Sequence, residues 1–218
     1  MLSLSNVYEN FNAEEPILTL REGETIDLKG KWAVKHFKND RPITLELACG
    51  RGEYGLALAA HYPERNFIGV DIKGARIWQG AKKAVQEKLD NLAFLRTRIE
   101  QIGYFFDKDE IDEIWITFPD PFLKKSKENR RLTSAQFLYR YKGILKQGGL
   151  IHLKTDNNVL YNFTLDTINK HPDYTVLYAN DDIYADQLYI PELNFKTYYE
   201  KQHLENGLNI KYIQMKKN

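Results

Sequence analysis

The chain has 218 residues, of which 43% are hydrophobic, so it is long enough to bury one substantial core. Its formal net charge is only +1, so any affinity for a polyanion must come from local clusters of charge. No apolar run reaches the ~18 residues of a membrane span, the single cysteine excludes an internal disulfide, and no Cys/His cluster predicts a metal site, so we expect a cytoplasmic protein.

The first 42 residues are predicted to form an N-terminal arm, followed by one domain over residues 43–218. The arm is acidic, because residues 1–28 contain six acids and one arginine, a net charge of −5. The predicted boundary lies near Arg41 and Pro42, where the first buried strand is about to begin.

Short apolar runs alternate with segments of helical periodicity along most of the domain. Five strands are expected at residues 43–48, 66–71, 92–97, 111–118 and 150–155, separated by helices at 53–61, 75–89, 99–106 and 134–145. A last helix at 158–169 precedes two more strands, at 174–178 and 207–215. Since parallel neighbours need crossover connections, this order predicts an α/β fold with a doubly wound, mostly parallel sheet of seven strands. No helical pattern is seen between residues 178 and 207, so the last two strands should form an antiparallel C-terminal hairpin.

A glycine-rich turn follows the first predicted strand. The segment Gly50–Gly55 matches G-x-G-x-x-G, with Asp71 at the end of the second strand to hold ribose hydroxyls. Glu46 inside the strand end and Glu53 at the start of the helix would oppose a pyrophosphate there. S-adenosylmethionine has a sulfonium cation and no phosphate, so the acids favour this cofactor over NAD. An NAD-dependent dehydrogenase is the alternative enzyme.

A second distinctive turn, Phe118-Pro119-Asp120-Pro121-Phe122, follows the fourth strand. Two prolines fix its backbone, and the end of a central strand directs Asp120 toward the same crevice as the glycine turn. The next residues, Lys124–Arg131, have five cations and one acid, a net charge of +4. Each part alone could be a proline-rich turn or a solvated basic stretch, but their combination at a strand end is not expected by chance.

The Pro-Asp-Pro turn and the basic segment resemble the bacterial tRNA (guanine-N7)-methyltransferase family. Three further segments agree with that family: Glu46–Gly52, Leu153–Asp156 and Thr197–Glu200. The resemblance implies the Rossmann-like fold of class I methyltransferases, with transfer of a methyl group from S-adenosylmethionine to N7 of a guanine in tRNA, guanine 46 of the variable loop.

The family resemblance also assigns roles to residues of this chain. After the third strand, where the family has an aspartate that contacts the adenine, this chain has Arg98 and Glu100. The residues predicted to bind the cofactor are Glu46, Gly50, Gly52, Asp71, Arg98, Glu100 and Asp120. The residues predicted to face the substrate are Lys124, Lys125, Lys127, Arg130, Arg131, Asp156, Thr197, Tyr198, Tyr199 and Glu200.

The chemistry of guanine N7 determines which catalytic groups the methyl transfer needs. N7 has an in-plane lone pair and no proton at neutral pH, so alignment and charge stabilisation should matter more than a general base. Asp120 is the predicted catalytic residue, since a carboxylate stabilises the positive charge that the guanine gains.

We expect tRNA as the partner, no obligate protein partner, no membrane association, and a monomer or homodimer. A silent RNA-binding subunit and an exocyclic amino methyltransferase are the remaining alternatives.

Overall fold

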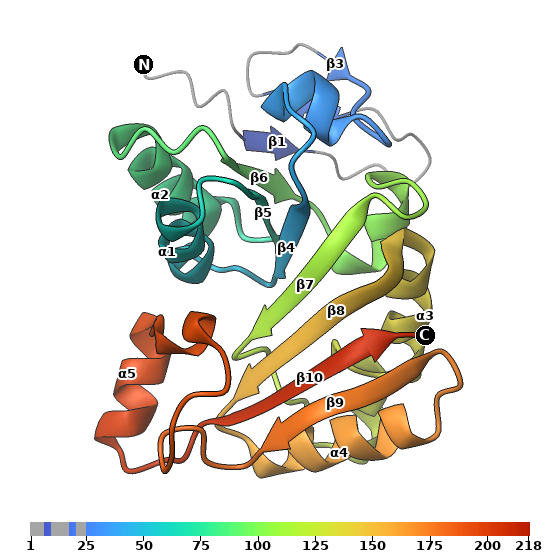
Figure 1. Ribbon diagram of the computed structural model, residues 1–218, viewed down its shortest axis with the longest axis vertical. Helices are drawn as coiled ribbons and strands as arrows, with labels where there is room; N and C mark the ends of the chain where they lie inside the picture. The colour runs from blue at the N-terminus through green and yellow to red at the C-terminus, as the bar shows by residue number, and fades with distance from the viewer. Residues whose placement is uncertain (1–6, 10–17, 21–24) are drawn as a thin grey trace.

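The computed structural model describes residues 7–9, 18–20 and 25–218, which form one sheet covered by helices on both faces (Figure 1). Residues 1–6, 10–17 and 21–24 of the predicted acidic arm lie outside the described residues, and with them Glu14, Glu15, Glu22 and Glu24. The strands are β1 Val7–Glu9, β2 Leu18–Leu20, β3 Thr25–Ile26, β4 Ile43–Leu47, β5 Asn66–Asp71, β6 Leu92–Arg96, β7 Ile111–Thr117, β8 Leu145–Thr155, β9 Tyr174–Asn180 and β10 Lys211–Lys217.

The helices alternate with these strands through most of the chain. The α-helices are α1 Glu53–His61, α2 Gly74–Gln86, α3 Ala135–Ile144, α4 Asn158–Asn169 and α5 Tyr198–Glu205. The shorter helical segments are η1 Trp32–Phe37, η2 Ile99–Tyr104, η3 Lys125–Arg130 and η4 Pro191–Asn194. None of the helices in the described part of the chain has the length and apolar character needed to cross a bilayer.

The order of the strands confirms the predicted fold class. The sheet runs β3-β2-β1-β6-β5-β4-β7-β8-β10-β9, with β4 to β8 parallel and β10 antiparallel to both β8 and β9. All seven strands expected from the sequence are present. The sheet also takes in three strands from the predicted arm, because β1 pairs in parallel with β6. The boundary near Arg41 and Pro42 stays a prediction.

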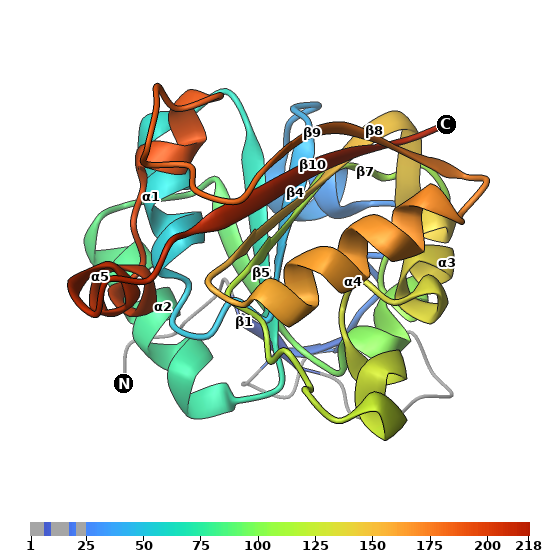
Figure 2. The same ribbon diagram turned by 90° about the horizontal axis from the view of Figure 1, so that it is seen from below.

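Two hydrophobic layers hold the helices to the sheet. One layer packs α1, α2 and the segment that contains η4 against one face, around buried residues such as Phe67 and Trp115. The other packs α3, α4, η1 and η2 against the opposite face, around Leu45, Ile114 and Leu153. Figure 2 shows the two groups of helices on either side of the sheet. Apolar side chains therefore cover both faces of the central strands, as a parallel sheet requires.

The segment between β9 and β10 differs from the expectation of a long loop. It contains η4 and the α-helix α5. The apolar pattern did not reveal α5 because the one residue that this helix buries is Glu200. The sequence nevertheless contains a signal for the start of α5, because Thr197 and Glu200 have the Thr-x-x-Glu spacing of a capping box. The Thr197 side chain accepts a hydrogen bond from the Glu200 backbone N–H, at 3.2 Å.

The glycine turn after β4 enters the left-handed region three times, at Ala48, Gly50 and Gly52, with φ of 57°, 57° and 66°. At Ala48 the left-handed conformation costs about 1–2 kcal/mol, because this residue, unlike a glycine, has a Cβ. The turn is also tightly packed at one point, since a Cβ on Gly52 would lie 2.5 Å from Cε1 of buried Phe94. A Cβ on Gly50 would meet no atom within 4 Å.

We expect Gly52→Ala to lower the free energy of unfolding by about 2–5 kcal/mol, because backbone strain adds to the clash with Phe94. Gly50→Ala is the matched control: it has the same strain without the clash and should cost about 1–2 kcal/mol. Urea unfolding of both variants measures the difference. Equal losses would mean that the packing against Phe94 does not constrain the turn.

Candidate active site

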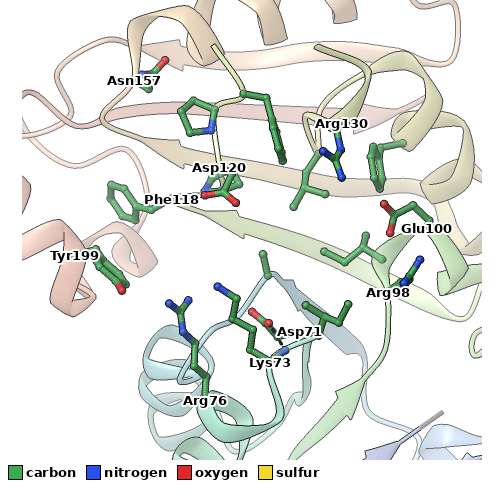
Figure 3. A pocket seen from close by; sticks show the side chains of 18 of the residues that line it. Asp71, Lys73, Arg76, Arg98, Glu100, Phe118, Asp120, Arg130, Asn157 and Tyr199 are labelled. Atoms are coloured by element: carbon green, nitrogen blue, oxygen red, sulfur yellow. Dashed lines mark hydrogen bonds between the residues drawn. The ribbon is translucent and has the colours of Figure 1, made fainter. Parts of the chain in front are cut away.

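A cavity of about 760 Å³ opens where the parallel strands end. Most of its lining comes from the residues that follow β4, β5, β6, β7 and β8, and α5 adds Tyr199 and His203 (Figure 3). The chain moves from β4 outward to β5 and β6, and then crosses back to β7 and β8 on the other side of β4. Such a switch in strand order leaves a crevice at the carboxyl ends of the strands, and ligands of open α/β sheets bind there. The volume suits a small-molecule ligand site.

The cavity brings together many of the residues predicted from the sequence. The predicted residues that line it are Asp71, Arg98, Glu100, Asp120, Arg130, Asp156 and Tyr199. A smaller pocket of about 90 Å³, here called the annex, adjoins it and shares Ala48, Arg76, Phe118 and Tyr199 with the main cavity. The predicted residues in the annex are Glu46, Gly50, Thr197, Tyr198 and Tyr199. The predicted residues that line neither space are Gly52, Lys124, Lys125, Lys127, Arg131 and Glu200.

Asp71 ties the glycine turn to the end of β5. Its Oδ2 accepts a hydrogen bond from the Gly50 N–H at 2.9 Å, and its Oδ1 accepts one from the Lys73 N–H at 2.8 Å. A carboxylate has about four acceptor positions, so two remain for hydroxyl groups of a ligand. Asp71 therefore shapes the wall of the cavity and keeps the capacity to bind a ribose.

Glu46 makes the corresponding link from β4. Its Oε2 accepts from the Gly55 N–H at 2.9 Å, and its Oε1 accepts from the Thr117 hydroxyl at 3.2 Å. Burial raises the pKa of the Glu46 carboxyl to about 8, although both hydrogen bonds act in the opposite direction. A cation entering the annex would favour the ionised form. Glu46 thus suits a cationic ligand close to its carboxylate.

The Pro-Asp-Pro turn is held from below by an arginine. Both flanking aromatic residues have positive φ, 49° at Phe118 and 41° at Phe122. Arg131 donates from Nε to the Pro121 carbonyl at 2.9 Å and from a terminal guanidinium nitrogen to the Phe122 carbonyl at 3.0 Å. Asp120 is exposed at the top of this turn, and within the described residues its carboxylate has no hydrogen bond or ion pair. The turn therefore presents a free carboxylate on a rigid backbone.

Arg131 does not fit the phosphate contact predicted for it. Its side chain is 3% exposed, and its guanidinium lies 4.3 Å from the centre of the Phe163 ring. The neighbouring cations Lys124, Lys125, Lys127 and Arg130 are exposed. The paired arginines of the sequence motif therefore have different roles, with Arg131 supporting the turn and Arg130 facing the cavity.

Glu200 is likewise withdrawn from the substrate side. It is fully buried and forms an ion pair with the equally buried Lys154, at 2.7 Å. The Tyr184 hydroxyl donates to the same carboxylate at 2.7 Å. Burial lowers the pKa of Lys154 below its ordinary value, while Glu200 acts in the opposite direction. The pair fixes α5 to β8, so that Tyr198 and Tyr199 stand half-exposed at the annex and cavity.

Several lining residues were missed by the sequence analysis. The rings of Phe118 and His203 stack with centroids 5.5 Å apart and planes 28° apart, and His203 Nδ1 lies 3.8 Å from an Asp156 carboxylate oxygen. Together with Tyr199 they give the cavity an aromatic wall suited to a flat base. His203 was missed because it lies on α5, the helix that was not predicted. Lys73 and Arg76 at the start of α2 are also part of the lining.

Comparison with known proteins adds an independent line of evidence. A family model described as putative methyltransferase matches residues 40–213. A tRNA (guanine-N(7)-)-methyltransferase of Christiangramia forsetii is 50% identical over 212 residues, which is 95% of this chain and 94% of that protein. One of the same name from Porphyromonas gingivalis is 50% identical over 202 residues, covering 91% and 81%. The 16S rRNA methyltransferase KamB is similar in fold, with a TM-score of 0.64 at 12% identity over 89% of this chain and 96% of that one.

We expect Glu200→Ala to lower the free energy of unfolding by about 3–5 kcal/mol, because Lys154 would remain buried without its partner. The double variant Lys154→Met, Glu200→Leu should lose less, since it buries no unpaired charge. Tyr199→Ala is the control on the same helix and should reduce activity with little loss of stability. Chemical denaturation and tRNA affinity are measured together. A Glu200→Ala protein of normal stability and weakened tRNA binding would restore the substrate role predicted from the sequence.

Proposed function

The chain belongs to the tRNA (guanine-N7)-methyltransferase family, and from this membership we propose that it transfers a methyl group from S-adenosylmethionine to N7 of a guanine in tRNA. The target guanine, by family resemblance, is position 46 of the variable loop. The observation that carries the proposal is the placement of Asp120, a free carboxylate on a rigid turn, across the cavity from Asp71 (Figure 3). The Asp71 side suits the ribose of a nucleoside, and the Asp120 side suits the positive charge that a guanine gains on methylation.

The residues present fit S-adenosylmethionine as the methyl donor. Asp71 keeps acceptor positions for ribose hydroxyls, and the space above Gly50 is open to a ligand. Arg98 and Glu100 line the cavity beyond β6, beside Ile99, where an adenine would be held. Buried Glu46 favours a cation in the annex. When bound, the cofactor supplies the activated methyl group.

The catalytic work assigned to this chain is positioning and charge stabilisation. Phe118, His203 and Tyr199 would stack against the target base and orient N7. Asp120 would lie beside the guanine and stabilise the positive charge that the ring gains on methylation. N7 needs no deprotonation, so no residue is assigned as a general base. Because N7 must approach the methyl group in line, we propose that the base unstacks into the cavity.

The tRNA backbone is proposed to bind the exposed segment Lys124–Arg130. Its four cations follow directly after the Pro-Asp-Pro turn, so phosphates bound there would place the target nucleotide at the cavity. All the residues named belong to one chain, and we propose that it acts without an obligate protein partner, as a monomer or homodimer. The cytoplasm, where tRNA is modified, is the proposed location.

The direct test is incubation with labelled S-adenosylmethionine and bulk tRNA, followed by nucleoside analysis. We expect label in 7-methylguanosine, mapped to guanine 46. Label in an exocyclic N-methyl nucleoside would assign the chain to amino methylation. Cofactor and tRNA binding without any transfer would indicate a silent RNA-binding subunit.

We expect Asp120→Asn to lower turnover by about 10²–10³-fold, corresponding to about 2.7–4 kcal/mol, by analogy with removal of one preorganised charge-stabilising group. Asn keeps the shape and loses the charge, so the fold and the cofactor affinity should persist. Glu100→Gln is the control, since it removes another exposed carboxylate from the same cavity and should alter cofactor affinity more than turnover. Near-normal turnover of Asp120→Asn at saturating cofactor and tRNA would make Asp120 a binding residue only.

A further inference from the structure

Three cations lie on the side of the cavity opposite the Lys124–Arg130 segment. Lys73 and Arg76 line the main cavity from the start of α2, and Arg51 lines the annex from the glycine turn, where Arg76 also takes part. Arg51 and Lys73 are exposed, and Arg76 is half-buried. Within the described residues their side chains have no hydrogen bond or ion pair. Figure 3 shows the Lys73 and Arg76 side chains rising from the lower wall toward Asp120.

Three acids that line the same walls of the cavity and annex already accept hydrogen bonds from the chain. Glu53 accepts a hydrogen bond from the Tyr198 backbone N–H at 2.6 Å. Asp71 accepts from two backbone N–H groups of the chain, and Glu46 is buried behind the glycine turn. No acid lies in the first turn of α2, where cations are unfavourable beside the positive end of the helix dipole, and the Asp71 carboxylate at the helix start is bonded to backbone N–H groups rather than to Lys73 or Arg76 side chains. Stability of α2 does not explain their presence, and such a conflict is expected at a functional site.

The cofactor does not account for all three cations. S-adenosylmethionine has one carboxylate, and one guanidinium is enough to bind a carboxylate through both oxygens. Two unpaired cations would still remain on this side. These cations are available to a ligand with several negative charges, and the proposed substrate supplies one in each of its phosphates.

The two cationic sides face each other across the mouth of the cavity. Figure 2 shows α2 and the yellow-green turn of η3 on opposite sides of the lower edge of the molecule. A nucleotide unstacked into the cavity leaves its chain neighbours outside, one on each side of the opening. The strand must therefore cross the mouth, with phosphates at both sides.

We propose that Arg51, Lys73 and Arg76 form a second tRNA-backbone contact, so that the RNA strand spans the cavity between this cationic side and the Lys124–Arg130 segment. The inference rests on the proposed function, because it assumes that tRNA is the substrate. It adds a surface on α2 and the glycine turn to the contact with tRNA.

The test measures tRNA affinity as a function of salt for Arg51→Ala, Lys73→Ala and Arg76→Ala. Each lost phosphate contact should weaken binding at low salt and reduce the slope of log K against log salt by about one. Arg51→Lys should keep the wild-type slope. Lys82→Ala is the matched control, because Lys82 is an exposed cation of the same helix whose Nζ lies over the Trp78 ring at 5.3 Å, away from the cavity lining.

The outcomes separate the rival explanations. Unchanged slopes in the three variants, or an equal change in Lys82→Ala, would overturn the proposal. Loss of S-adenosylmethionine affinity in Arg76→Ala with an unchanged salt slope would assign that residue to the cofactor carboxylate and also overturn it. Wild-type protein that methylates guanine N7 while the slopes stay unchanged defeats only this inference. Wild-type protein without transfer to tRNA defeats the proposed function itself.

Discussion

The carboxylates of Glu46 and Asp71 fix the backbone on which the candidate site depends. They come from neighbouring strands and accept the N–H groups of Gly55 and Gly50, at opposite ends of the same turn. Together with the backbone hydrogen bonds of the Cys49 and Gly52 N–H groups, these two acceptors hold a turn that passes through the left-handed region three times. A Cβ on Gly55 would lie 2.9 Å from a Glu46 oxygen, so a side chain at this position would displace the carboxylate from its hydrogen bond. Acids first interpreted as ligand contacts are thus also structural groups.

The strained backbone of the Pro-Asp-Pro turn is held by a cation, the Arg131 guanidinium, instead of by carboxylates. Positive φ at Phe118 and Phe122 costs strain, and such strain persists only where surrounding contacts fix the backbone. Arg131 provides those contacts through two hydrogen bonds to carbonyls of the turn. Because the guanidinium is buried over Phe163 and needs partners, the turn and the arginine stabilise each other. Asp120 stays free as a consequence, since its side chain is not needed to hold the turn.

Much of the fold followed from the sequence, because apolar runs and glycine turns mark parallel strands directly. The site was predictable where residues follow a strand end, as Asp71, Asp120 and Asp156 do. The sequence motif did not indicate the direction of each side chain, because a motif describes only which residues are adjacent. Glu200 directly follows Tyr199 on α5, yet its side chain points into the core toward Lys154. No spacing rule reveals a partner that lies 46 residues away in the sequence. Likewise, adjacent Arg130 and Arg131 face opposite environments.

The balance of charge in the cavity constrains how a polyanion is attracted to it. Its lining contains four acids and four cations besides His203: Asp71, Glu100, Asp120, Asp156, Lys73, Arg76, Arg98 and Arg130. A neutral lining gives little long-range attraction for tRNA, and it avoids excluding a cationic cofactor. The attraction must then arise outside the lining, from Lys124, Lys125 and Lys127 on one side and Arg51 on the other. The whole chain has a charge of only +1. Because the excess cations lie outside a neutral cavity lining, one protein can bind a sulfonium in the cavity and a polyanion beside it.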